Sequence, residues 1–375
     1  MGTNASSART GVIVGLLVLG SVLFLPLVAA ASGSSGTGVG SVYTMTNAAS
    51  GNAVVWYSRS VSGQLTWQGT FDTGGLGAGS GLGSQGSLVL GEGGNVLLAV
   101  DAGSNEISAF QVTSSGLALT DHVSSGGVMP VSVTIFGNLV YVVNAAGTPN
   151  IAGFTLGSDG SLTMIPGSIQ ALSGSAPAQV SFDATGQVLV VTEKATSTID
   201  TFVVDANGVA GPATSHASNG ATPFGFAFDN KGHLIVSEVG GGPSGTSALS
   251  TYAVGADGSL TTISASVPDF EFAACWVITT NNGKFAYTSN AHPPSNDLST
   301  YAVAPNGQLA LAQEVAAKPG NGPTDLAVSG NSKFLYVLDS GDGAIAGFMV
   351  HRDGSLAALS TVSGLLASDV GLAAT

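Results

Sequence analysis

The tetrapeptide Asp159-Gly160-Ser161-Leu162 is the clearest copy of a turn that recurs along the whole chain. Asp-Gly and Asn-Gly pairs supply the positive φ angles of tight hairpin turns without steric cost. The glycines of the related turns stand at positions 63, 116, 160, 208, 258, 307 and 354. They lie on average about 48 residues apart, the length of one four-stranded unit in a repeat protein. The spacing therefore predicts seven copies of one structural unit.

Each repeat contains short apolar runs that are separated by turn residues. In the fourth repeat the runs are 179–182, 188–192 and 199–204, with Gly186 and Gly208 in the turns between and after them. Their β-branched and aromatic residues are typical of strands, and helical periodicity is absent outside the N-terminal segment. We predict an all-β fold, a seven-bladed β-propeller with four-stranded blades.

The first repeat lacks one strand. It begins at Ser41 with a run that matches the second strand of the other repeats, whereas the C-terminal residues 370–374 match the first strand at 324–328. Pairing the C-terminal strand into the first blade would close the ring and remove an exposed sheet edge. We therefore predict this closure and one propeller domain over residues 39–375.

Residues 1–31 predict an export signal. Arg9 precedes the uncharged apolar run 11–25, and Pro26 and the alanines 29–31 follow, which is the order of a signal peptide and its cleavage region. An uncleaved membrane anchor is the alternative, because about 20 apolar residues can span a bilayer. Residues 32–38 predict a flexible leader. We expect a secreted or extracytoplasmic protein that touches a membrane only if the N-terminal segment is retained.

The charge balance excludes several partners. The chain has 22 acidic residues against 8 lysines and arginines, a net charge of −14, and no basic stripe. Nucleic acid and anionic membrane surfaces would be repelled, so we exclude both as partners. Cys275 is the only cysteine, which excludes an intrachain disulfide. We expect a monomer with a small-molecule or carbohydrate-type ligand.

Three segments carry a family resemblance: Ser-Val-Tyr-Thr-Met-Thr-Asn at 41–47, Val-Val-Thr-Glu-Lys at 190–194 and Thr-Pro-Phe-Gly-Phe-Ala-Phe-Asp at 222–229. They resemble the secreted bacterial members of the lactonase-like seven-bladed propellers, a family that includes 6-phosphogluconolactonases of the propeller type and carboxymuconate-lactonising enzymes. The resemblance covers residues 39–375 and implies the propeller fold and the hydrolysis of a lactone.

The family's enzymes place histidine and arginine around the mouth of the central channel. In this chain the corresponding entrances at 128–130, 175–177 and 320–323 contain neither residue type. Arg59 and Arg352 are the only arginines after the N-terminal segment. The resemblance, corrected for this difference, implies a neutral sugar-type or small organic lactone rather than a phosphorylated or polycarboxylate substrate.

The ends of the seven second strands predict a ring of polar side chains at one mouth of the channel. The ring consists of Asn47, Asp101, Asn144, Glu193, Glu238, Asn290 and Asp339. These side chains either cap their own turns, or their crowded carboxylates raise one another's pKa for acid–base work or bind a hard cation such as Ca²⁺. Glutamate is a poor turn former, so Glu193 and Glu238 are the candidate catalytic bases. Lys194 would neutralise Glu193 or polarise a substrate carbonyl.

The innermost strands contribute further candidates. Gln179, Trp276 and Asp325 are expected to face the channel, where Trp276 would either plug it or stack on a sugar or lactone ring. His216 and His292 are alternative bases on the same face. Three hypotheses stay open: a lactone hydrolase without a cofactor, a non-catalytic binding or scaffold propeller at the cell surface, and a lactonase assisted by a divalent cation at the acidic mouth.

Overall fold

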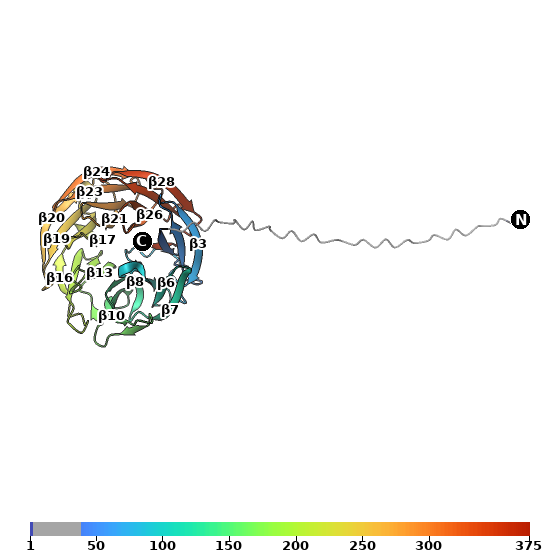
Figure 1. Cartoon of the computed structure of the whole chain (residues 1–375), viewed down its shortest axis with the longest axis horizontal. Coiled ribbons are helices and arrows are strands. Elements are labelled where there is room, and N and C mark those ends of the chain that lie inside the picture. Colours follow the sequence, from blue (N-terminus) through green and yellow to red (C-terminus); the bar gives the residue numbers. More distant parts are fainter. Residues whose placement is uncertain (3–38) are drawn as a thin grey trace. The chain divides into compact units, whose positions relative to one another are not determined.

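The computed structural model describes residues 1–2 and 39–375, and residues 39–375 form a closed ring of seven β-sheets (Figure 1). Two short 3₁₀ segments, Glu92–Gly94 and Pro243–Gly245, are the only helical elements among the described residues. In the same part of the chain, no helix has the length and apolar character needed to cross a membrane. The predicted export signal and flexible leader fall on residues 3–38 and so lie outside the described residues.

Each sheet is one blade, and its strands run antiparallel from the channel to the rim. From the innermost strand outward, blade 1 contains β29 (Val370–Ala374), β1 (Gly40–Met45), β2 (Ala53–Arg59) and β3 (Leu65–Asp72); blade 2 contains β4 (Leu88–Leu90), β5 (Val96–Asp101), β6 (Glu106–Thr113) and β7 (Gly116–Ser124); blade 3 contains β8 (Val128–Phe136), β9 (Leu139–Ala146), β10 (Asn150–Leu156), and β11 (Leu162–Met164) with β12 (Gln170–Ala171) beside β10.

The remaining four blades follow in chain order. Blade 4 contains β13 (Pro177–Phe182), β14 (Val188–Glu193), β15 (Thr198–Val203) and β16 (Thr214–Ala217); blade 5 contains β17 (Ala221–Phe228), β18 (His233–Gly240), β19 (Ala248–Val254) and β20 (Leu260–Pro268); blade 6 contains β21 (Ala274–Thr279), β22 (Phe285–Asn290), β23 (Asp297–Val303) and β24 (Leu309–Ala317); blade 7 contains β25 (Pro323–Val328), β26 (Phe334–Asp339), β27 (Ala344–Val350) and β28 (Leu356–Ser363). The prediction of seven four-stranded blades is confirmed.

Burial falls from the middle of each blade to its rim. Every residue of β14 and of β26 is buried, since these second strands are covered by the neighbouring blades on both faces. Such strands need apolar residues at nearly every position, and both are rich in valine, leucine or aromatic residues. The outermost strand β28 instead mixes half-buried and exposed residues. The apolar runs that predicted the fold are therefore the strands that pack between blades.

The C-terminal strand closes the ring, as predicted. β29 pairs antiparallel with β1, with Val42 opposite Ala374 and Tyr43 opposite Ala373. Figure 1 shows the C-terminus at the centre of the ring, inside the first blade. The Arg59 Nη2 donates to the carbonyl of Thr375 at 3.0 Å, and the Ser41 amide donates to the Thr375 Oγ1 at 2.7 Å. The two ends of the propeller thus form one hydrogen-bonded sheet.

The turn glycines that defined the repeat lie against the preceding blade. In six of the seven turns, the glycine carbonyl accepts a hydrogen bond from a hydroxyl group of that blade. The donor–glycine pairs are Tyr336–Gly63, Thr120–Gly160, Tyr141–Gly208, Thr201–Gly258, Thr251–Gly307 and Tyr287–Gly354. The turns therefore join neighbouring blades as well as neighbouring strands.

Candidate functional site

The predicted ring residues occupy equivalent places on one face of the propeller. Glu193, Asn290 and Asp339 each end a second strand and lie opposite the first residue of the innermost strand of the same blade. Asn144 and Glu238 lie opposite a proline of the innermost strand. We call the face on which the second strands end the mouth face. All seven ring residues are buried.

Two ring carboxylates have complete sets of hydrogen-bond donors. Asp101 accepts hydrogen bonds from Asn52 Nδ2 at 2.9 Å, Thr73 Oγ1 at 2.6 Å and Ser108 Oγ at 2.5 Å. Burial nevertheless raises the pKa of Asp101 above its usual value. Glu238 accepts from the Gly220 amide at 2.8 Å, Ser218 Oγ at 3.2 Å and Ser266 Oγ at 2.7 Å. Asp101 thus connects blade 2 to blade 1, and Glu238 holds the chain segments at the start and end of blade 5 together.

Glu193 forms a pair with a second carboxyl group, Asp200 of β15. Burial, followed by the hydrogen bond and charge of Asp200, raises the pKa of Glu193 to about 8. Asp200 is held by the amide and hydroxyl of Ser173, at 2.7 and 2.5 Å. A Cβ atom at Gly174 would collide with the Glu193 carboxylate, so this backbone covers it. Glu193 thus lies beneath a loop of blade 4 rather than in an open mouth.

The three ring asparagines bond to residues of their own blades or to the connections between neighbouring blades. Asn47 Nδ2 donates to the Ser80 carbonyl, and its Oδ1 accepts the Ala78 amide. Asn144 Nδ2 donates to Ser125 and Asn150, and Asn290 Nδ2 donates to Asp297 and Ser299. These contacts match the turn-capping interpretation of the ring positions.

The long connection between β3 and β4 closes the centre of the mouth face. Its residues 82–86 form what we call the plug segment. The Gln85 side chain donates to the Val277 carbonyl at 2.9 Å and accepts the Val277 amide at 3.0 Å. Trp276 Nε1 donates to the Ser84 carbonyl at 2.8 Å, and Ser84 Oγ donates to Val131 at 2.8 Å. The plug segment thereby joins blades 3 and 6 across the channel.

Lys194 lies at the edge of the plug segment. Its Nζ donates to the Gly83 carbonyl and sits 4.8 Å from the centre of the Phe224 ring. Burial lowers the pKa of Lys194. Phe224 in turn packs against Trp276, with ring centres 4.9 Å apart. Lys194 is therefore fixed against an aromatic pair and the plug segment, and no salt bridge to Glu193 forms.

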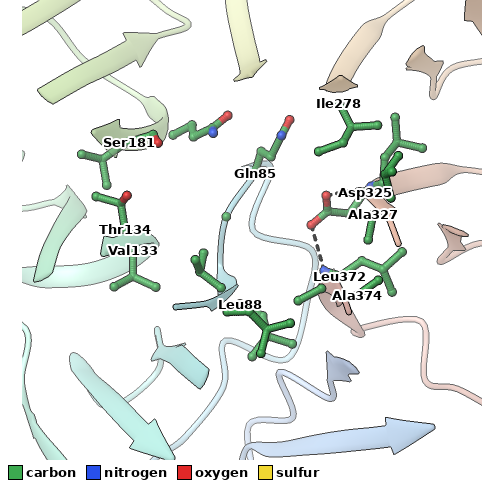
Figure 2. A pocket seen from close by; sticks show the side chains of 18 residues that line it. Gln85, Leu88, Val133, Thr134, Ser181, Ile278, Asp325, Ala327, Leu372 and Ala374 are labelled. Atoms are coloured by element: carbon green, nitrogen blue, oxygen red, sulfur yellow. Dashed lines mark hydrogen bonds between the residues drawn. The ribbon is translucent and has the colours of Figure 1, made fainter. Parts of the chain in front are cut away.

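Below the plug segment, the channel is a cavity of about 280 Å³ (Figure 2). Gln85, Gln179 and Asp325 supply its main polar groups. Gln85 joins the plug segment to blade 6, and the other two join innermost strands of neighbouring blades. Gln179 accepts the Phe226 amide at 2.7 Å and donates to the Phe226 carbonyl at 3.0 Å. Asp325 accepts the Leu372 amide at 3.1 Å, and burial raises its pKa to about 8. Gln179 and Asp325 thus line the channel cavity, and both side chains connect blades.

A second cavity opens beside the plug segment on the mouth face. This mouth pocket has a volume of about 230 Å³. It is lined by the plug residues Leu82, Gly83 and Ser84 with Gly81, by Trp276, Thr324 and Ser340, and by the connection and strand at Asp369, Val370 and Gly371. Asp369 is the only titratable residue in this lining. Its Oδ1 accepts the Leu366 amide at 3.2 Å, its Oδ2 has no partner, and burial raises its pKa to about 7.

The comparison with protein families agrees with this architecture. Residues 259–365 match the family described as lactonase, 7-bladed beta-propeller. Over this stretch the chain resembles the lactonase-like seven-bladed propellers. No curated protein matches its sequence.

Solved structures share this seven-bladed propeller fold at low sequence identity. A protein from Lactobacillus plantarum gives a TM-score of 0.73 at 16% identity, over 90% of this chain and 99% of that chain. A candidate 6-phosphogluconolactonase from Bacteroides fragilis gives 0.71 at 18% identity, over 91% and 99%. The periplasmic gluconolactonase PpgL of Pseudomonas aeruginosa gives 0.69 at 16% identity, over 89% and 99%.

The histidines of the chain lie away from both cavities. His216, on the outermost strand β16, contacts Thr201 Oγ1 at 3.2 Å and the Gly258 carbonyl at 3.0 Å through its Nε2. His292 is exposed and its Nδ1 contacts the Pro293 carbonyl. The Cys275 thiol is buried, which raises its pKa to about 12 and makes it a poor nucleophile. Within the described part of the chain, no three histidine, cysteine or acidic residues cluster as metal ligands.

The residues predicted from the sequence and the mouth pocket lie on the same face, but the prediction did not include most of the residues that border the pocket. Of the predicted site residues, Trp276 alone lines the mouth pocket. Asp369 escaped notice because it precedes the displaced strand β29 and has no equivalent in the repeat alignment. The plug segment left one signal in the sequence: the interval from Gly63 to Gly116 is the longest between turn glycines, and the extra residues are rich in glycine.

Proposed function

We propose that this lactonase-like propeller hydrolyses a neutral sugar-type lactone in the mouth pocket. The observation that carries the proposal is the set of groups around that pocket: an indole ring, three hydroxyl groups and one carboxyl group with a raised pKa. An aromatic surface combined with a few convergent polar groups suits a hydroxylated ring. The likeness to a periplasmic gluconolactonase supports the same substrate class.

Asp369 would act as the general base. Its Oδ2 accepts a proton from a water molecule while the water oxygen attacks the lactone carbonyl. The ring C–O bond then breaks, and the leaving alkoxide takes the proton back from Asp369. The product is the open-chain hydroxy acid. A pKa of about 7 allows the carboxyl group both to accept and to return the proton near neutral pH.

Thr324 and Ser340 would orient the substrate. The Thr324 hydroxyl reaches the Leu338 carbonyl only at 3.5 Å, and the Ser340 hydroxyl reaches the Gly322 carbonyl only at 3.4 Å. Such long contacts are weak, so both hydroxyls can turn to a ligand. No lysine, arginine or histidine borders the pocket. A phosphate or carboxylate would find no cationic partner there, which supports a neutral substrate.

The N-terminal sequence and one structural neighbour support an extracytoplasmic location. Residues 1–31 carry the features of an export signal, and the similar gluconolactonase from Pseudomonas aeruginosa is periplasmic. In its own host, the protein should lose roughly its first 30 residues, or stay tethered to the membrane if cleavage fails. N-terminal sequencing of the protein from each cell fraction tests this, and an intact soluble Met1 form in the cytosol would contradict it.

Asp369→Asn tests the hydrolase proposal. The substitution keeps the shape of the side chain and removes the base, so turnover of a neutral aldonolactone should fall by about 10²-fold or more. For the unmodified protein, kcat/KM should rise as the pH passes through about 7, because the ionised carboxylate is the active form. A panel of neutral and acidic lactones, followed by proton release, measures both effects.

Glu193→Gln and Glu238→Gln are the matched variants. The sequence-based hypothesis makes one of these residues the base, whereas the mouth-pocket proposal predicts that both variants retain turnover when folded. Loss of turnover in Glu193→Gln or Glu238→Gln, with full activity in Asp369→Asn, would contradict the assignment to Asp369. Thermal unfolding of all three variants separates loss of the base from loss of the fold.

A non-catalytic binding propeller is the second candidate, and the plug segment favours it. This segment occupies the centre of the mouth face, and Asp369 is only 1% exposed. A binding protein predicts no turnover of any lactone in the panel, together with saturable binding of a sugar or lactone measured by calorimetry. Trp276→Leu should then weaken binding by roughly tenfold, the loss of one aromatic stacking contact.

A further inference from the structure

Asp339 of blade 7 is a buried carboxyl group that has neither a hydrogen-bond donor nor a cationic partner in the described part of the chain. Its side chain is at the end of β26 and the residue is 1% exposed. Neither carboxylate oxygen has a hydrogen-bond partner. Among residues 1–2 and 39–375, the basic partners in the salt bridges are His122 and His233, which pair with Glu106 and Asp229. No lysine or arginine of these residues pairs with the Asp339 carboxyl group. An isolated buried carboxylate is costly, so Asp339 must be neutral or paired with a cation.

The equivalent position in blade 2 shows that the fold can satisfy a carboxylate at this place. Asp101 ends the second strand of that blade and accepts hydrogen bonds from three side chains, those of Asn52, Thr73 and Ser108. Blade 7 supplies no such donors around Asp339. The shared strand position therefore does not explain the lack of partners at Asp339.

A second carboxylate borders the same space. A Cβ atom added to Gly320 would lie 2.5 Å from Asp342 Oδ2 and 3.2 Å from Asp339 Oδ2. The two carboxylates thus converge on a gap that the glycine leaves open. Asp342 is fixed by the amide and the side chain of Asn321, at 2.8 and 2.9 Å. These bonds hold one oxygen donor group in place beside the unpartnered one.

We propose that Asp339 and Asp342 bind a hard divalent cation of the Ca²⁺ class. Carboxylate oxygens are the preferred ligands of such cations, and backbone carbonyls or water complete their coordination shells. A bound cation would neutralise the charge that the protein leaves unpaired. A cation binds the ionised carboxylates, so protons and cations would compete for this site.

The proposed cation site adjoins the mouth pocket along the chain. The cation proposal does not depend on the proposed hydrolase function. Ser340, which follows Asp339 directly, lines that pocket. A cation at Asp339 and Asp342 would hold the 339–342 turn against residues 320–322, which it already contacts through the Gly341 amide and the Asn321 carbonyl at 3.1 Å. Loss of lactone turnover would therefore leave the cation proposal standing, and the reverse also holds.

The test is calorimetric titration of the chelator-treated, full-length protein with CaCl₂ at pH 8, together with thermal unfolding. We expect saturable binding of one Ca²⁺ and a rise in unfolding midpoint of about 5 °C at a free concentration of about 100 times Kd. Asp339→Asn should abolish both effects, and Asp342→Asn should weaken binding by about tenfold or more. Asp101→Asn removes a charge at the equivalent position and should leave the Ca²⁺ response unchanged.

Two results would overturn the proposal. The first is absence of binding to the unmodified protein, with Asp339→Asn more stable than the unmodified protein at pH 8, which would show that Asp339 is kept neutral by a proton. The second is an equal Ca²⁺ response in the unmodified protein and in the folded Asp339→Asn variant, which would place the cation elsewhere.

Discussion

At the scale of single residues, the turn glycines have two roles that the sequence reveals only in part. Gly63 adopts a φ of +82°, a backbone conformation that favours glycine, and this explains its presence in the turn. Its carbonyl also accepts a 2.8 Å hydrogen bond from the buried Tyr336 hydroxyl of blade 7. The same arrangement joins Tyr141 to Gly208 at 2.7 Å. The glycine thus allows the tight turn within its own blade, and its carbonyl also binds the preceding blade.

Removal of such a hydroxyl should destabilise the ring. Tyr336→Phe leaves the Gly63 carbonyl buried without its donor, so the free energy of unfolding should fall by about 1–2 kcal/mol. Tyr57→Phe is the matched control, because Tyr57 is also buried and its hydroxyl has no hydrogen-bond partner among the described residues. Denaturant titrations of both variants measure the difference. An equal effect of the two substitutions would show that the turn contact adds no stability.

The ring residues show where inference from residue type succeeds and where it fails. Glu193 and Glu238 were proposed as bases because glutamate rarely caps a turn, yet Glu238 does hold its loop through Gly220, Ser218 and Ser266. The longer glutamate side chain reaches back to the start of the same blade. The sequence alone cannot show that the Glu238 side chain meets these residues, because the contact depends on how β18 is aligned with the innermost strand β17.

At the scale of elements, the closing strand β29 joins the two ends of the propeller in one blade. It is the innermost strand of blade 1, yet it enters that blade from the other end of the sequence. Without it, β1 would present an unpaired edge to the channel, and the Arg59 side chain would lose its contact with Thr375.

Deletion of residues 370–375 should prevent formation of a stable ring. We expect soluble, monodisperse protein to fall by about tenfold or more in size-exclusion chromatography, because the open sheet edge promotes aggregation. Deletion of Thr375 alone should be far milder, since the β29 pairs from Val370 to Ala374 remain. A truncated protein with an unchanged unfolding midpoint would contradict the role of β29 as the closing strand.

At the scale of the whole molecule, buried carboxyl groups dominate the expected pH dependence. Burial raises the pKa of Asp269 and Asp297 to about 6, of Asp339 and Asp369 to about 7, and of Glu193 and Asp325 to about 8. In the unfolded chain these groups return to ordinary values near 4. The folded state therefore binds more protons between about pH 4 and pH 8.

Stability should accordingly fall as the pH rises through this window. The stabilisation from these groups is fully present below about pH 4 and is lost as they ionise between about pH 6 and pH 8. With chelator present, we expect the unfolding midpoint at pH 5.5 to exceed that at pH 8.5 by more than about 5 °C. Asp325→Asn should reduce the difference. A higher midpoint at pH 8.5 would show that the carboxyl groups are compensated in the folded state.

The sequence predicted the architecture fully and the site only in outline. Seven evenly spaced turns and a displaced strand at 370–374 were sufficient for blade number and closure, because both follow from local patterns that repeat. The mouth pocket depends on single, unrepeated features, the plug segment and Asp369, that no periodicity identifies. Repetition thus reveals the scaffold, whereas the candidate site lies where the repeat is broken.

The plug segment has a consequence for how the chain reaches its native state during synthesis. Gln85 bonds to Val277, 192 residues further along the chain, and Ser41 bonds to Thr375, 334 residues away. The contact between Gln85 and Val277 cannot form until about three-quarters of the polypeptide has left the ribosome. The contact between Ser41 and Thr375 requires the whole chain. Contacts of such long range form late. If the chain is exported, it would therefore stay unfolded enough to pass through a translocation channel until its last blade is made. The pairing of β29 with β1 would then form on the far side of the membrane.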